Sequence, residues 1–170
     1  MFQRRGQYNN PRDYFARDLD DYVSGFGDPS KEFWLGLDKL VSLTRGGAEL
    51  LIQLETFEGQ KIRAKYSDFR VEEGPDYRLQ VSGYSGSAGN PLRIDTGMAF
   101  SARDSDRDLW DGDCSDTRGG GGWWYNGCGL ANLNGRNLGK GESGYDGILW
   151  YLYAKDNRSF KSTKMMMRKK

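Results

Sequence analysis

The stretch at residues 104–128 of the 170-residue chain reads DSDRDLWDGDCSDTRGGGGWWYNGC and holds the chain's most informative motifs. Five aspartates fall within its first ten residues, and four consecutive glycines and an aromatic triplet lie between its two cysteines. A long loop of this composition inside a folded domain is usually functional, or is held by something other than backbone ladders. The sequence offers two such restraints, a bound cation and a disulfide.

The acidic cluster at 104–113 predicts a cation site. Unpaired carboxylates repel one another, and hard oxygen ligands on alternate residues of an irregular loop suit calcium. The pattern is not an EF-hand, because Leu109 stands where that loop needs glycine and Ser115 where it needs glutamate. The alternative interpretation, a solvated acidic turn, is equally compatible with the spacing.

Cys114 and Cys128 are the only cysteines of the chain. A bond between them would close a loop of about 15 residues and stabilise the fold by about 3 kcal/mol in the chain-entropy model. Two reduced cysteines in a cytosolic protein are the alternative, because one pair does not establish the compartment.

The composition excludes several classes of function. The absence of histidine removes Ser-His-Asp and Cys-His catalysis and imidazole zinc ligands. A net charge of +1 argues against a nonspecific grip on nucleic acid, so small ligands or proteins are the expected partners. No stretch approaches the roughly 20 apolar residues of a membrane span. The protein is therefore cytosolic, or its export signal lies outside this chain.

The remaining patterns predict one α+β domain. Helical spacing of apolar residues indicates short helices within 11–25 and over 31–44. Alternation then predicts an antiparallel meander at 48–55, 62–66, 69–72 and 77–82, with a hairpin at 57–60, and a last strand at 162–168.

Aromatic side chains gather around the second cysteine and again near residue 145. Trp123, Trp124 and Tyr125 precede Cys128, and Tyr145-Asp146 follows later. Rings beside a carboxylate are typical of a carbohydrate or acetyl pocket, because a ring stacks on a sugar face. The alternative is core packing, and we expect Trp123 or Trp124 to point inward.

Several motifs together make the sequence resemble the C-terminal domains of fibrinogen, from Phe2 almost to the end. The motifs are EFWLG (32–36), YSDF (66–69), YSGSAG (84–89), DSDRD (104–108), GWWYNGC (122–128) and ANLNGR (131–136). The opening, residues 3–15, looks especially like the tachylectin-like lectins of arthropod innate immunity. Ficolins and the fibrinogen chains are more distant.

This resemblance implies a secreted α+β domain that recognises ligands and catalyses nothing. Its expected architecture is an antiparallel sheet with short helices and a long loop-rich calcium and ligand subdomain. Residues 1–170 would form a single domain truncated at its N-terminus, because the family's domain begins upstream of Phe2. The full-length form would be a homo-oligomer, since weak single sites gain avidity when multiplied.

The resemblance also implies a set of site residues. The Ca²⁺ ligands would be the side chains of Asp106 and Asp108 and the backbone carbonyls of Trp110 and Gly112. Cys114 and Cys128 would form the family's disulfide, with a cis peptide at Gly127–Cys128. The ligand pocket would comprise Tyr125, Gly127, Cys128, Tyr145 and Asp146.

Two departures from the family pattern keep three functions open. Gly129 stands where lectins that bind acetyl groups commonly carry histidine, and glycines from Gly119 onward replace an aromatic residue. The first function is calcium-dependent binding of acetylated or anionic glycans, such as microbial surface polysaccharides. The second is recognition of a protein or peptide, whose amino terminus would meet Asp146. The third is a degenerate pocket without glycan binding.

Overall fold

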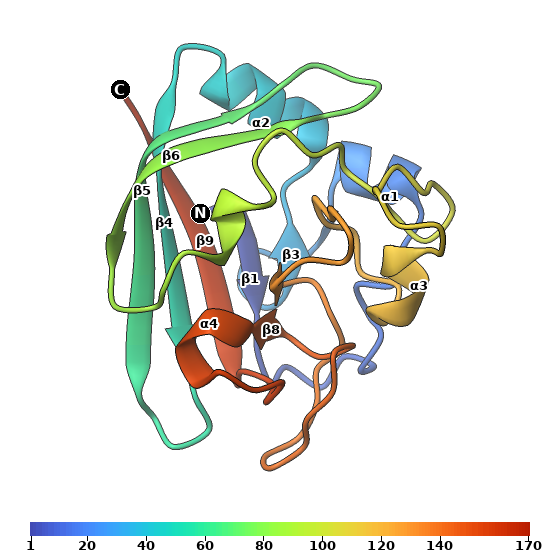
Figure 1. The fold of residues 1–170 in the computed structure, drawn as a ribbon, viewed down its shortest axis with the longest axis vertical. Coiled ribbons are helices and arrows are strands. Elements are labelled where there is room, and N and C mark those ends of the chain that lie inside the picture. The colour runs from blue at the N-terminus through green and yellow to red at the C-terminus, as the bar shows by residue number, and fades with distance from the viewer.

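A large antiparallel sheet forms one layer of the protein, and loop-rich segments from the second half of the chain pack on one of its faces (Figure 1). The computed structural model describes residues 1–170, apart from the side chain of Ala154. Within the described residues the sheet has seven strands in the order β2-β3-β1-β9-β4-β5-β6. Their bounds are β1 Gln3–Arg5, β2 Phe26–Gly27, β3 Phe33–Trp34, β4 Ala48–Glu55, β5 Lys61–Val71, β6 Leu79–Gly86 and β9 Ser162–Lys169.

The meander β4-β5-β6 largely confirms the alternation in the sequence. Leu50, Ile52 and Leu54 of β4 are buried, while the residues between them face outward. The separate strands predicted at 62–66 and 69–72 are wrong in one respect, because β5 runs unbroken from Lys61 to Val71. Asp68 is paired with Ser82 of β6, which keeps the backbone extended through the polar residues.

Both predicted N-terminal helices begin later than the sequence suggests. Helix α1 covers only Leu19–Ser24 and helix α2 only Leu37–Thr44. Phe33 and Trp34 are in β3, which hydrogen-bonds to both β1 and β2. Gly36, with a φ of 115°, lies between this strand and α2 and has a backbone conformation that no helix can adopt.

The last predicted strand is confirmed as β9, and it holds the two parts of the sheet together. It pairs with β1 on one side and with β4 on the other. Sequence analysis missed β1, because a three-residue strand is too short for alternation to be visible.

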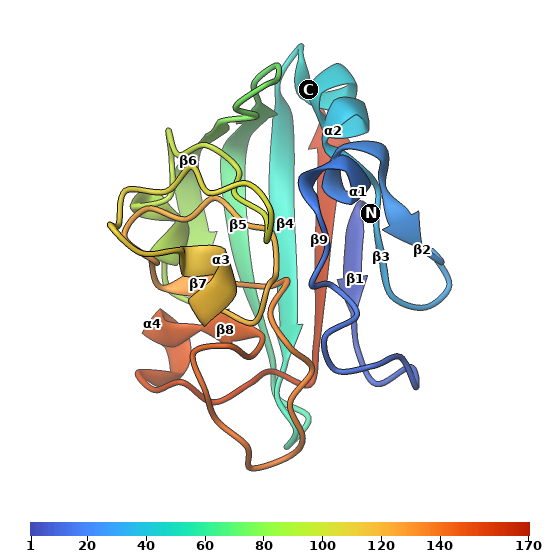
Figure 2. The ribbon, with the colours of Figure 1, turned by 90° about the vertical axis from the view of Figure 1, so that its right-hand side faces the viewer.

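The loop layer contains the remaining elements and carries much of the aromatic core. They are the 3₁₀ helix η1 (Pro91–Arg93), α3 (Cys114–Thr117), α4 (Tyr151–Ala154) and the two-stranded sheet of β7 (Ala131–Asn132) and β8 (Leu149–Trp150). Figure 2 shows this layer from its own side, in front of the sheet. Trp123, Trp124 and Trp150 are all fully buried, so both tryptophans of the pair point inward.

A buried arginine joins the two layers. Arg5 of β1 pairs with Glu32 at 3.0 Å, and its guanidinium donates to the carbonyl oxygens of Leu133 at 3.3 Å and Gly135 at 2.7 Å. Both charged side chains are essentially inaccessible to solvent. The two hydrogen bonds from Arg5 fix the 133–135 segment against the sheet. Loss of either Arg5 or Glu32 would leave an uncompensated buried charge.

No helix in the described part of the chain has both the length and the apolar character needed to cross a lipid bilayer.

Candidate functional site

The loop at 104–113 folds back on itself and gathers three carboxylates. Oxygen atoms of Asp106, Asp108 and Asp113 lie within 4.8 Å of one another. Asp108 organises the loop: its carboxylate accepts hydrogen bonds from the backbone N–H groups of Trp110 and Cys114, both at 2.8 Å. Burial raises the pKa of Asp108, and the charge of Asp106 raises it further against the lowering effect of these donors. The loop thus brings anionic groups together.

The donor set suits a hard cation. Oxygen atoms converging from an irregular loop are the ligands that Ca²⁺ takes in proteins. Asp106 and Asp108 were predicted for this role, and the carbonyl-bearing residues Trp110 and Gly112 lie in the same loop. Asp113 was missed, although it directly precedes Cys114 in the sequence.

Asp104, outside the three-carboxylate cluster, and Asp113, within it, also cap helices. Asp104 accepts a hydrogen bond from the N–H of Leu19 at 2.8 Å and so caps the first turn of α1. Asp113, besides its place in the cluster, caps α3 by accepting from the N–H of Asp116 at 3.1 Å. The spacing of the aspartates alone does not separate a capping residue from a ligand.

The disulfide between Cys114 and Cys128 is confirmed, with Cα atoms 5.0 Å apart. It links the end of the acidic loop to the turn that follows the aromatic triplet. A backbone hydrogen bond from Leu109 to the carbonyl oxygen of Asn126, at 2.7 Å, makes a second link between the same segments. The acidic loop and the 126–128 turn are therefore held as one unit.

A shallow pocket of about 240 Å³ opens beside this unit. It is lined by Trp110, Thr117, Arg118, Cys128 and Tyr145. Trp110 and Tyr145 are 47% and 53% exposed, respectively, so two large rings border the pocket in contact with solvent.

Arg118 forms the polar wall of the pocket. Its guanidinium lies 4.8 Å from the centre of the Tyr145 ring and donates to the carbonyl oxygens of Tyr145 at 3.3 Å and Gly129 at 3.2 Å. These contacts hold a positive charge against the aromatic wall. Arg118 could not be predicted from the sequence. The glycine run that follows has no periodicity that would indicate which way the Arg118 side chain points.

The structure brings together only part of the predicted ligand set. Cys128 and Tyr145 line the pocket, and Gly127 is exposed beside them. Tyr125 is fully buried, and its hydroxyl donates to the carbonyl oxygen of Gly121 at 2.6 Å, so it belongs to the core. Among the described residues Asp146 does not line this pocket; its carboxylate accepts from Arg136 at 3.2 Å.

The expected cis peptide at Gly127–Cys128 is a further correction. Within the described chain the cis peptide bond precedes Pro75 instead. The turn at the second cysteine is made by positive φ angles at Cys128 (72°) and Gly129 (69°).

Gly129 lies directly above a buried carboxylate. A Cβ atom placed on Gly129 would be 2.8 Å from Oδ1 of Asp95. Asp95 is fully buried; its Oδ2 accepts from Nε1 of Trp123 at 3.4 Å, and its Oδ1 has no hydrogen-bond partner among the described residues. Burial raises the pKa of Asp95 to about 8. A side chain at the position that the family pattern gives to histidine would therefore press on this carboxylate and strain the backbone.

The glycine run is equally constrained by close backbone packing. A Cβ on Gly121 would be 2.2 Å from the carbonyl oxygen of Asn134, in the segment that Arg5 fixes. A Cβ on Gly119 would be 2.8 Å from the carbonyl oxygen of Asp146. An aromatic side chain at Gly119 or Gly121 would therefore displace the neighbouring backbone.

Comparisons with known proteins agree on the family. The family described as the C-terminal globular domain of the fibrinogen beta and gamma chains matches residues 1–170. Techylectin-5A of Tachypleus tridentatus is 38% identical over 171 residues, which cover 99% of this chain and 58% of that protein. Human angiopoietin-4 is 39% identical over 173 residues, 99% of this chain but 34% of that protein. The chain thus spans about a third to somewhat over half of these relatives.

Solved structures support the fold independently. The fibrinogen-like globe domain of human ANGPTL6 superposes with a TM-score of 0.92 at 36% identity, covering 98% of this chain and 76% of that one. A lamprey fibrin D-dimer complexed with the peptide Gly-His-Arg-Pro-amide gives a TM-score of 0.84 at 32% identity, covering 98% of this chain and 59% of the other. The α+β fold expected from the resemblance is confirmed.

Proposed function

Because this chain belongs to the family of fibrinogen C-terminal domains, we propose that it is a secreted, calcium-dependent lectin-like module that binds acetylated or anionic glycans in innate immunity. It would recognise ligands without catalysing a reaction. None of the relatives compared above has the name of an enzyme, and one, Techylectin-5A, is named as a lectin.

The observation that carries this proposal is the pair of exposed rings beside Arg118. Trp110 and Tyr145 border one pocket, and both present large aromatic surface to solvent. Aromatic rings stack on the apolar faces of sugars, and a few fixed polar groups then orient the ligand. Arg118 supplies a cation at this wall, which favours a ligand with a carboxylate or another anionic substituent.

Calcium would act on this pocket through the loop that carries Trp110. The carboxylates of Asp106, Asp108 and Asp113 would hold the ion, with the carbonyls of Trp110 and Gly112 as further ligands. The N–H of Trp110 already donates to Asp108, so ordering of the cluster also orders the aromatic wall. Calcium dependence of ligand binding follows from this connection.

A glycan array probed with the oligomerised protein, with and without calcium, tests the proposal. We expect N-acetylated or acidic glycans to bind in the presence of calcium. The Tyr145→Ala variant should lose this binding. Tyr8→Ala, which removes another solvent-exposed tyrosine, is the matched control and should bind as the parent does. Glycan binding that survives Tyr145→Ala would show that the glycan site is not the pocket beside Tyr145.

Peptide recognition is the second candidate, and the lamprey fibrin structure with its bound peptide favours it. Two features of this chain disfavour binding of a positively charged peptide amino terminus. The carboxylate of Asp146 is already paired with Arg136, and Arg118 places a positive charge at the pocket wall. Titration with Gly-His-Arg-Pro-amide distinguishes the candidates. Saturable peptide binding without any glycan binding would favour peptide recognition.

A further inference from the structure

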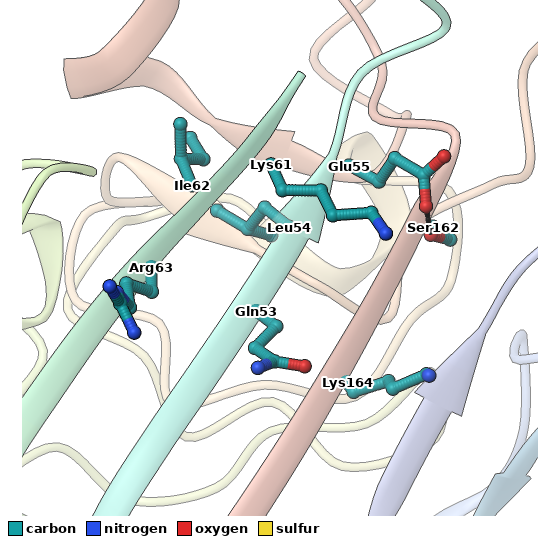
Figure 3. A pocket seen from close by; sticks show the side chains of 8 residues that line it. All are labelled: Gln53, Leu54, Glu55, Lys61, Ile62, Arg63, Ser162 and Lys164. Carbon is teal, nitrogen blue, oxygen red and sulfur yellow. Dashed lines mark hydrogen bonds between the residues drawn. The ribbon is translucent and has the colours of Figure 1, made fainter. Parts of the chain in front are cut away.

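The outward face of the sheet carries a row of cations that strand register aligns. Arg4 of β1 lies opposite Lys164 of β9, Lys164 opposite Gln53 of β4, and Gln53 opposite Arg63 of β5. This cationic row, Arg4–Lys164–Gln53–Arg63, crosses four strands on the face turned away from the core. Figure 3 shows Gln53 between Arg63 and Lys164, with Lys61 at the beginning of β5.

Carboxylates do not neutralise the centre of the row. In the described residues, none of the ion pairs involves Lys61, Arg63 or Lys164. The acidic residues of β4 are engaged at its two ends. Glu49 pairs with Arg168 at 2.6 Å, and Glu55 pairs with Lys161 at 3.3 Å.

Such an arrangement costs stability in the isolated protein. Like charges directly opposite one another on neighbouring strands are destabilising, and Arg4 and Lys164 are such a pair. The neutral amide of Gln53 occupies the position from which a carboxylate would relieve both Lys164 and Arg63. An anionic partner would supply the missing compensation.

The spacing of the charges suits an extended polymer. Neighbouring strands lie about 4.8 Å apart, so the row spans about 15 Å from Arg4 to Arg63. Lys61, Arg63 and Lys164 also line a hollow of about 370 Å³. Gln53 and Ser162 line the same hollow and offer neutral hydrogen-bonding groups between the cations. Its one carboxylate, Glu55, lies opposite Lys61 and is engaged by Lys161.

We propose that this sheet face binds a linear sulfated polysaccharide, at a second site separate from the pocket of Trp110 and Tyr145. Several cations within about 15 Å favour a polymer that carries its negative charges at short intervals. Neutral amide and hydroxyl groups between the cations suit the hydroxyls of a sugar chain. The residues that line the hollow include no aromatic ring, which disfavours single-stranded nucleic acid, because such ligands stack on rings.

The site is independent of calcium and of the proposed function. The residues of the cationic row come from β1, β4, β5 and β9, whereas the acidic loop lies in the layer on the buried face of the sheet (Figure 1). Failure of glycan binding at the pocket would therefore leave this proposal standing, and the reverse also holds.

Heparin binding by the whole chain tests the proposal. We expect heparin to bind with an affinity that falls with added salt, and the Arg63→Gln/Lys164→Gln double variant to weaken it by about tenfold. The control double variant Arg93→Gln/Lys140→Gln removes one exposed arginine and one exposed lysine outside the sheet and should change affinity less than twofold. Equal losses in both variants would overturn the site.

Gln53→Glu gives a test that removes no cation. The new carboxylate would lie between Lys164 and Arg63, so it should weaken heparin binding by a similar factor while thermal stability stays equal or rises. Unchanged heparin affinity in a folded Gln53→Glu protein would contradict the proposal.

Competing ligands and chelation complete the experiment. Hyaluronate, with one carboxylate per disaccharide, should bind more weakly than heparin, and chelation of calcium should leave heparin affinity unchanged. The proposal is overturned if heparin does not bind at low salt, or if chelation abolishes its binding. Equally tight binding of duplex DNA or phosphatidylserine vesicles at the same residues would overturn the assignment to a sulfated polysaccharide.

Discussion

Replacing Asp95 with asparagine should stabilise the protein at alkaline pH and change little at acidic pH. The Asp95 side chain is fully buried, one carboxylate oxygen has no partner among the described residues, and the other accepts one 3.4 Å hydrogen bond. Burial raises its pKa to about 8, against the lowering effects of Trp123 and Arg118. Asparagine has a similar shape and no charge to desolvate.

The sign and size of the effect follow from linkage. Between about pH 4 and pH 8 the folded protein keeps a proton on Asp95 that the unfolded chain has released, so the free energy of unfolding decreases as pH rises through this window. A gap of about 4 pKa units at 1.36 kcal/mol per unit gives about 5 kcal/mol, lost in full above pH 8. The asparagine variant does not lose this free energy of unfolding, because its side chain carries no titrating proton.

Urea unfolding at pH 5, 6.5, 8 and 9 in saturating calcium measures the difference. The stability of Asp95→Asn relative to the parent should increase across the series by about 4 kcal/mol, because the series starts about 3 pH units below the pKa of Asp95. The exposed Asp13→Asn variant controls for removal of a carboxylate at the surface. A difference between Asp95→Asn and parent that stays constant with pH would show that the pKa of Asp95 is not raised in the folded protein.

Three further perturbations test the site. Chelation should lower the melting temperature by about 5–10 °C, since calcium at a hundred times its Kd contributes about 2.7 kcal/mol. Calorimetry should show a smaller shift for Asp113→Asn. Equal melting temperatures with and without chelator would exclude the metal. Cys114→Ser/Cys128→Ser should lower the free energy of unfolding by about 3 kcal/mol in urea titrations, and an unchanged value would show that the bond adds no stability. Gly129→Ala should destabilise by about 1–3 kcal/mol through its positive φ and the 2.8 Å approach to Asp95 Oδ1, and a neutral effect in the same assay would contradict that packing.

Period-two alternation predicted the long strands because one face of each is buried. Leu50, Ile52 and Leu54 establish β4 by themselves, and β9 ends within one residue of its expectation. Helical spacing was less informative at Phe33 and Trp34. Both side chains are buried, as a helix stripe would also require, but their backbone partners lie in β1, distant in sequence, and in the nearby strand β2.

The candidate site was predictable where its residues lie close in sequence. Asp106, Asp108 and the disulfide all fall within residues 106–128. Arg118 and Asp95 escaped because their roles depend on tertiary contacts: one lies against Tyr145, the other beneath Gly129. The buried position of Tyr125 likewise depends on Gly121, whose carbonyl accepts its hydroxyl.

The central place of β9 has a consequence for biosynthesis. As the chain emerges from the ribosome, β1 and β4 are made early, yet the strand that joins them is Ser162–Lys169. Until it arrives, both strands present unpaired edges, which are templates for association with other chains. The sheet can therefore close only after residues 162–169 have been made, and during that interval chaperones would protect the nascent domain from aggregation.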